Sequence, residues 1–306
     1  MNPNQYQSSF KNHLYAILIA LVSCIAVLGA MHLFGVAGPQ QSQNGSLRVG
    51  DGLTVHFIDV GQGDSILLTC DGKTMLIDGG GSDKGETVVR YLKSQRINYL
   101  DVLVATHPHL DHIGGLDTVV QSFPVKTLYT PVTESDSDFF RELAAACETA
   151  GVKLTVPKAD KSFSLGSAKV TVLGPRGDYA AQENVNNMSI VLRVDYGEKS
   201  FLFTGDAEYD EETAILDAGC MVDVDVLKAG HHGSEDSTGS RLLHEATPDF
   251  CVISCGEGNS YGHPHDNLLS RLRDAGVEVY RTDQQGTVVC VTDGKTLRFV
   301  TEKNAD

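Results

Sequence analysis

Three histidines and one aspartate stand within six positions, directly after an apolar run at residues 102–105. The segment reads His107-Pro108-His109-Leu110-Asp111-His112. Imidazole and carboxylate groups are the ligands expected of zinc, manganese and iron ions. One histidine alone would more often be a surface or core residue, but four such groups on one turn favour a metal site. Alternation in an extended turn predicts that His107 and His109 point one way, which leaves Asp111 and His112 for a neighbouring ion.

Other apolar runs end in groups of the same chemical kind. A single aspartate before glycine is usually a turn residue, yet here several predicted strand ends carry an acid or a histidine. In layered α/β folds the carboxyl ends of strands converge on one edge, where ligands bind. We therefore expect one site that joins the histidine segment to the following dispersed residues: Asp78, Asp206, His231, His232, His263 and His265.

Short β-rich runs and helical patterns alternate along the chain and must position this chemistry. Strands are predicted at residues 53–60, 74–77, 102–106, 189–194, 201–204, 224–229 and 250–254. Helices are predicted at residues 86–95, 137–150, 210–218, 239–246 and 266–275, and glycines at 151, 219 and 276 suit left-handed caps after three of them. Strands too apolar to face water on both sides predict an α/β fold of layered sheets covered by helices. Gly114 and Gly115 would let a helix begin close beneath the ions.

These motifs together resemble the metallo-β-lactamase fold superfamily. The similar features are the His-x-His-x-Asp-His run, the Asp-Gly-Gly and Gly-Asp strand ends and the later histidines. More narrowly, residues 55–65, the His-His-Gly-Ser run at 231–234 and residues 261–265 resemble the hydrolase domain of ComEC-type DNA-uptake proteins. The resemblance covers about residues 53–301, and it implies an αββα sandwich with a two-ion site at one edge of the sheets.

The resemblance also implies how the ligands divide between two divalent ions, expected to be Zn²⁺ or Mn²⁺. His107 and His109 would bind the first ion, Asp111 and His112 the second, and Asp206 would bridge them. One later histidine completes the second site. We favour His232, which follows a predicted strand, with three competitors: His231, His263 and His265.

One feature departs from the lactamases and the glyoxalase-type hydrolases of the superfamily. Those enzymes carry a further histidine before the bridging aspartate, but no histidine lies between His112 and Asp206. The ComEC-like branch has an Asn-Asn-x-Ser run there, matched here by Asn186-Asn187-Met188-Ser189, so an amide or water would replace the missing ligand. A site with fewer nitrogen ligands should hold its first ion more loosely and tolerate Mn²⁺ better.

The predicted chemistry is attack by hydroxide. The two ions would share a water molecule and lower the pKa of that water towards about 7, so that it forms hydroxide near neutral pH. We expect Asp111, His231 and His265 to act in catalysis, with protonated His231 or His265 stabilising phosphoryl charge and protonating the leaving group. Asp78 is expected to orient a ligand. Residues expected to support ligands or contact substrate are Asn187, Ser234 and His263. In the first predicted strand His56 has a structural role, while Asp59 or Asp64 braces the metal loop.

The N-terminal region contains 24 residues, 14–37, without Asp, Glu, Lys or Arg. At about 1.5 Å per residue, this run exceeds the roughly 30 Å hydrocarbon core of a bilayer and predicts one transmembrane helix. Lys11 lies before it and the next charge is Arg48, so the body is expected outside the cytoplasm. A cleaved signal peptide or lipidation at Cys24 is the alternative. The predicted parts are the tail and anchor at 1–37, a flexible linker at 38–52 and a hydrolase domain at 53–306.

Composition narrows the possible functions. Lys and Arg number 24 against 40 Asp and Glu, a formal charge of −16, and this disfavours a protein that simply coats DNA, because such binding uses basic residues. Seven cysteines without a CxxC pair favour neither a disulfide scaffold nor a zinc ribbon. The leading hypothesis is a membrane-tethered phosphodiesterase or nuclease acting on a phosphodiester such as DNA. The alternatives are a hydrolase of a small or cell-surface non-nucleic phosphoester and a noncatalytic surface module. No protein partner is predicted.

Overall fold

A computed structural model describes residues 52–177, 179 and 184–304 of the chain. The predicted transmembrane segment 14–37 and the predicted linker, apart from Gly52, lie outside these residues. Within the described residues no helix has the length and apolar character needed to cross a bilayer.

The first sheet has eight strands in the order β15-β14-β1-β2-β3-β4-β5-β6. Its antiparallel half joins β1, β2 and β3 to the C-terminal hairpin, and its parallel half runs from β3 to β6. Because β3 and β4 are parallel, their carboxyl ends reach the same edge. The strand bounds are β1 Leu53–Phe57, β2 Ile66–Cys70, β3 Lys73–Ile77, β4 Leu100–Val104, β5 Val125–Tyr129, β6 Leu154–Thr155, β14 Val288–Thr292 and β15 Leu297–Thr301.

The second sheet has seven strands in the order β13-β12-β11-β10-β9-β8-β7. Strands β7 to β10 are antiparallel, whereas β10 to β13 are parallel. The carboxyl ends of β10, β11 and β12 therefore also share one edge. The strand bounds are β7 Ser162–Leu165, β8 Ala168–Gly174, β9 Val191–Tyr196, β10 Lys199–Phe203, β11 Val226–Lys228, β12 Phe250–Ile253 and β13 Glu278–Arg281.

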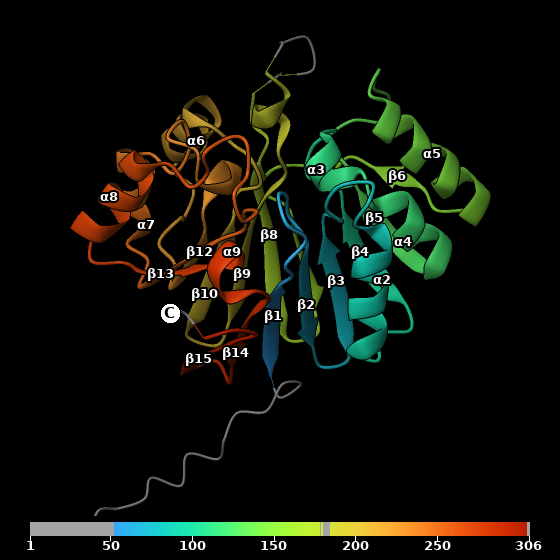
Figure 1. Cartoon of the computed structure of the whole chain (residues 1–306). Helices are drawn as coiled ribbons and strands as arrows, with labels where there is room; N and C mark the ends of the chain where they lie inside the picture. The colour runs from blue at the N-terminus through green and yellow to red at the C-terminus, as the bar shows by residue number, and fades with distance from the viewer. Residues whose placement is uncertain (1–51, 178, 180–183, 305–306) are drawn as a thin grey trace, which may run out of the picture. The chain divides into compact units, whose positions relative to one another are not determined.

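Helices cover the outer face of each sheet (Figure 1). On the first sheet these are α2 Gly85–Ser94, α3 Leu110–Ile113, α4 Leu116–Ser122 and α5 Asp138–Ala150, and on the second α6 Tyr209–Asp217, α7 Ser240–Ala246 and α8 Asp266–Asp274. Short turns of helix lie at η1 Val185–Met188, η2 Gly230–Gly233 and α9 Thr282–Gln285. One buried cluster fills the space between the sheets, and one lies under each helical layer. The predicted αββα sandwich is confirmed.

Apolar side chains alternate between the two faces of the strands and so divide into these clusters. Leu68 and Val104 face the inner cluster, whereas Leu67 and Leu103 face the helices. Gly151 ends α5 as predicted, with a left-handed φ of 69°, a conformation that glycine adopts without steric cost. The sequence patterns did not predict the partly exposed strands β5, β7 and β15, nor the buried strand β2.

Two glycine segments bring the metal-binding turn against the end of β3. A Cβ on Gly115 would lie 2.4 Å from the carbonyl oxygen of Gly79, so only glycine fits. The Gly79 N–H donates to the carbonyl of His112 at 2.7 Å, and the Gly115 N–H donates to that of Gly80 at 3.0 Å. The predicted close packing of the Gly-Gly pair is therefore present, and it ties α3 to the turn after β3.

Candidate metal centre

The histidine segment leaves the end of β4 and enters α3. His107 and His112 are buried and His109 is half-buried. His107 Nε2 lies 3.1 Å from His109 Nδ1, which agrees with the expectation that these two side chains point to the same place. Burial lowers the pKa of His107 well below its usual value, so that ring keeps a free lone pair at neutral pH.

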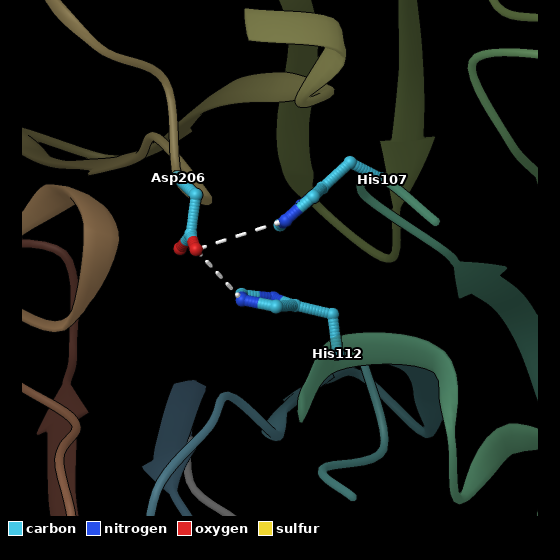
Figure 2. Close-up of side chains that lie close together, drawn as sticks. All are labelled: His107, His112 and Asp206. Carbon is cyan, nitrogen blue, oxygen red and sulfur yellow. Dashed lines mark ion pairs between the residues drawn. The ribbon is translucent and has the colours of Figure 1, made fainter. Parts of the chain in front are cut away.

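Asp206 approaches these rings from the second sheet, directly after β10. Figure 2 shows its carboxylate facing His107 and His112 from the opposite side. Asp206 Oδ2 lies 3.1 Å from His112 Nε2 and 3.7 Å from His107 Nε2. The Asp206 N–H donates to Ser189 Oγ at 3.0 Å, and its buried Oδ1 has no hydrogen-bond partner. A buried carboxylate oxygen without a donor is what a cation would satisfy.

His232 reaches the same place from η2, after β11. Its Nε2 lies 3.1 Å from His112 Nε2 and 3.2 Å from Asp111 Oδ2. Its Nδ1 lies 3.1 Å from the Ser254 carbonyl. A carbonyl can only accept, so Nδ1 carries a proton and Nε2 is the nitrogen left to bind an ion. Among the four later histidines, the favoured His232 is the one whose ring nitrogen joins both Asp111 and His112 in one group of ligands.

The spacing of these atoms fits divalent ions. Ligands that bind one tetrahedral ion at about 2.1 Å lie about 3.4 Å apart. Among the described residues, four groups of three ligand atoms lie close enough together to hold an ion, and two of them border the predicted ligand segment: His107 with His112 and Asp206, and Asp111 with His112 and His232. The cluster of histidines and aspartates can therefore bind divalent metal.

Asp78 holds His112 from behind. Asp78 Oδ2 lies 2.8 Å from His112 Nδ1 and accepts from Thr106 Oγ1 at 2.6 Å, while Oδ1 accepts the Thr106 N–H at 2.8 Å. Since Nδ1 faces the carboxylate, Nε2 faces the cluster. This geometry agrees with the predicted orienting role of Asp78, because such carboxylates fix the orientation of metal-binding histidines.

A buried ion pair lies behind His232. Lys228 Nζ lies 2.9 Å from Asp64 Oδ2, with exposed side-chain fractions of 0% and 2%. Burial alone would raise the pKa of Asp64, but Lys228 and His232 lower it to about 2. Asp64 Oδ1 lies 3.4 Å from His232 Nδ1. Asp59 and Asp64 were the two candidates for supporting the metal-binding residues. Asp64 contacts His232, whereas Asp59 accepts the Gly61 N–H within its own turn.

Three predicted residues lie apart from the cluster. His265 Nδ1 accepts the Glu235 N–H at 3.0 Å and Nε2 lies 3.2 Å from the Tyr261 carbonyl, so the geometry does not favour a catalytic role. Ser234 is buried, and its Oγ accepts from the N–H of Asp236 in its own turn. Asn187 is also buried and its Oδ1 accepts the Glu208 N–H at 2.9 Å, which makes it a support for the loop after β10.

The cluster opens into a cleft of about 590 Å³. Its lining includes His109, Asp111, His231 and His263. The predicted His263 faces this space beside the metal cluster, and its buried Nδ1 has no hydrogen-bond partner. Burial lowers the pKa of His263 to about 4, so it enters the cleft as a neutral ring.

Sequence reasoning missed three polar residues that contact the cluster. Lys228 ends the apolar strand β11, and nothing in the sequence marks it as part of the site. Its role as the buried partner of Asp64 is visible only in the structure. Ser189 touches both His107 Nδ1, at 3.3 Å, and the Asp206 backbone. Glu208 lies 3.2 Å from His231 Nδ1. Two signals were available in the sequence: the Asn-Asn-x-Ser run that ends at Ser189, and the closeness of Glu208 to Asp206 in the chain.

Comparison with known proteins agrees with this geometry. The family model of the metallo-beta-lactamase superfamily matches residues 58–257. The chain belongs to the metallo-β-lactamase superfamily. Membership and the histidine–aspartate cluster together support a metal-dependent hydrolase.

Competence proteins are among its curated relatives. The chain is 32% identical to ComE operon protein 3 of Bacillus subtilis over 252 residues, which cover 76% of the chain and 32% of that protein. It is 32% identical to Recombination protein 2 of Haemophilus influenzae, over 76% of the chain and 28% of that protein. The chain thus spans about a third of the length of these relatives. Igni18, a metallo hydrolase of the archaeon Ignicoccus hospitalis, shares the fold at 16% identity with a TM-score of 0.50, covering 77% of the chain and 98% of Igni18.

Metal binding is expected to release protons near neutral pH. Burial alone would lower the pKa of His112 and His232, but Asp206 and the neighbouring carboxylates raise both well above 6.5 in the ion-free protein. The ions must displace these protons, so affinity should rise as pH rises and fall as it falls. The stability of the ion-free protein depends on pH in the opposite direction. The two histidines stabilise the fold fully below pH 6.5, and this contribution is lost as the pH rises through their raised pKa values.

Calorimetric titration of Zn²⁺ at pH 7, in two buffers of different ionisation enthalpy, measures this release. The apparent enthalpies should differ in proportion to the released protons. Equal enthalpies in both buffers would show that the histidines are already deprotonated.

Proposed function

We propose that this protein is a membrane-tethered phosphodiesterase or nuclease that uses two divalent ions, Zn²⁺ or Mn²⁺. The observation that carries the proposal is the group of His107, Asp111, His112, Asp206 and His232 at the floor of an open cleft. Two bound ions supply a hydroxide at neutral pH and neutralise charge on the phosphoryl oxygens. The similarity to competence proteins supports a nucleic-acid substrate.

The chain's own residues divide the remaining tasks. Asp206 contacts histidines from both sheets, Asp78 orients the ring of His112, and the Ser254 carbonyl orients that of His232, with Asp64 beside it. The neutral His263 is placed to hydrogen-bond an oxygen of the substrate in the cleft. No Lys or Arg is among the described residues that line the cleft, so phosphate affinity has to come from the ions.

An exposed aromatic ring favours a nucleotide over a simple phosphoester. Tyr261, 64% exposed, lines the cleft and lies nearly parallel to His263, with ring centroids 5.7 Å apart and planes at 22°. Stacking of a base on an aromatic side chain contributes about 1–3 kcal/mol. Tyr261 is therefore a candidate surface for a base next to the scissile phosphate.

The direct test is hydrolysis by the purified full chain, loaded with Mn²⁺ or Zn²⁺, of single-stranded DNA, RNA and bis-p-nitrophenyl phosphate. We expect cleavage of nucleic acid and of the small diester, both lost with chelator. Hydrolysis of the small diester alone would favour the non-nucleic alternative. A chain that binds no metal would favour the noncatalytic module.

Replacing Tyr261 with alanine is expected to slow DNA cleavage about tenfold, because one base loses its stacking partner. Hydrolysis of bis-p-nitrophenyl phosphate should change less than about threefold, because its phosphate needs no flanking base. The control is Tyr99→Ala, which removes another exposed ring, 42% exposed, just before β4 and at the opposite end of the strand from the histidines. Equal losses on both substrates would show that Tyr261 supports the cleft and does not select a base.

The tether and its orientation are part of the proposal. Support comes from the 24 uncharged residues at 14–37 and from Lys11 before them. Protease added to intact cells should then digest the hydrolase domain. Protection until the membrane is opened would place the domain on the cytoplasmic side.

A further inference from the structure

The first ion has one nitrogen ligand fewer than in the lactamases, and the residues expected to compensate are engaged elsewhere. The Asn187 amide oxygen accepts the Glu208 N–H at 2.9 Å. Ser189 Oγ accepts the Asp206 N–H at 3.0 Å. Neither side chain offers a nitrogen ligand to an ion beside His107.

His231 approaches Asp206 from the cleft. His231 Nε2 is 3.7 Å from Asp206 Oδ2, the same distance that separates His107 Nε2 from that oxygen. Both distances are close to the spacing of about 3.4 Å expected between two ligands of one ion. His231 also lines the cleft, with its side chain 24% exposed.

The backbone holds His231 in this position against its ordinary preference. His231 and His232 both have positive φ, 45° and 53°, in the left-handed region that residues other than glycine rarely adopt. The His231 N–H donates to the carbonyl of Gly205 at 3.1 Å, beside Asp206. Strained backbone of this kind gathers at sites where function requires it.

Glu208 determines which ring nitrogen of His231 faces Asp206. Glu208 Oε1 lies 3.2 Å from His231 Nδ1, so Nε2 is the ring nitrogen left to face Asp206. Nε2 faces the Asp206 carboxylate at 3.7 Å, where an ion bound to Asp206 would be within its reach. A carboxylate behind a metal-bound histidine is the usual way in which proteins orient such a ligand.

The asparagine run places Glu208. Asn186 Nδ2 donates to Glu208 Oε1 at 2.7 Å, and Asn184 Nδ2 donates to Oε2 at 2.5 Å. The segment that stands where other family members have a histidine thus holds the carboxylate that orients His231. The segment that lacks the histidine therefore supports, through Glu208, an imidazole that faces Asp206.

We propose that His231, positioned by Glu208, is the third nitrogen ligand of the first ion, with His107 and His109. This inference rests on the proposed two-ion centre and not on the phosphodiester substrate. It replaces the expected role of His231 as a proton donor.

Co²⁺ titration of the purified full chain tests the assignment without an activity assay, by visible absorption and by metal analysis. The wild type should bind two ions. His231→Asn suits the left-handed backbone, since asparagine is enriched there, and one of its two ions should bind at least about 100-fold more weakly, with a changed absorption band. Glu208→Gln should keep both ions and weaken one about 10- to 100-fold.

His244→Ala is the matched control, because His244 is exposed on α7, and both affinities should stay unchanged. His231→Ala repeats the test without an amide and covers a failure of the asparagine variant to fold. Two ions bound with unchanged affinity and absorption in the His231 variants would overturn the assignment, as would a wild type that binds one ion. A wild type that binds two ions yet cleaves no phosphodiester would refute the proposed function and leave this ligand in place.

Discussion

Asp206→Asn is expected to lose metal-dependent hydrolysis by about 10³-fold or more and to bind at most one ion. Nε2 atoms of four histidines lie within 3.7 Å of Asp206 Oδ2, so this carboxylate is the one negative group shared by all of them. Removal of a single stabilising group from an active site typically costs roughly 10²–10³ in rate, and here the second ion is lost as well. Metal analysis and the rate on bis-p-nitrophenyl phosphate measure both effects.

Asp210→Asn provides the matched control for this substitution. Asp210 lies in the first turn of α6 and is exposed, and the same change in charge there should leave the rate and metal content unaltered. Circular dichroism should show that Asp206→Asn keeps the fold, because the strands around it are held by apolar packing. Full activity of Asp206→Asn would remove the two-ion mechanism.

Lys228→Met is expected to destabilise the domain by about 3–5 kcal/mol, the usual cost of leaving one partner of a buried ion pair alone. Methionine fills a similar volume, but Asp64 would keep its charge without the ammonium. Because Asp64 then no longer has a fixed position behind His232, metal affinity should also fall, by about 10- to 100-fold. Urea unfolding of the metal-loaded chain and Co²⁺ titration measure the two changes.

The double variant Asp64→Asn/Lys228→Met separates charge from packing. The double variant should be more stable than Lys228→Met alone and regain much of the lost free energy of unfolding, because no buried charge remains unpaired. Lys84→Met is the surface control: its pair with Asp83 has exposed side-chain fractions of 35% and 75%, and such pairs contribute about 0–1 kcal/mol. A loss below about 1 kcal/mol in Lys228→Met would mean that Asp64 gains a proton or water at little cost.

The metal cluster could be predicted from the sequence because its residues follow strands. Parallel strands carry the residues after them to a common edge, so Asp78, Asp206 and the segment from His107 to His112 were brought together by topology alone. The preference for His232 rested on the same reasoning, and the structure places it against Asp111 and His112. These predictions needed no knowledge of side-chain orientation.

The supporting contacts could not be predicted because they depend on orientation and register. His231 and His232 are adjacent, and only their left-handed backbone directs both rings towards Asp206. His265 resembles them in sequence, yet its two nitrogens contact backbone atoms. The pairing of Asp64 with Lys228 joins the two sheets, and no local pattern predicts which strand end lies opposite which.

The place of β14 beside β1 has a consequence for how the chain matures. β1 is the first strand of the described chain and β14 the last but one, and Phe57 pairs with Val288 at the end of their ladder. Until the hairpin of β14 and β15 has been synthesised, one side of β1 offers unpaired backbone groups, which readily recruit strands of other molecules. A chain that stops before Val288 is therefore prone to aggregate, because this edge of β1 then stays unpaired.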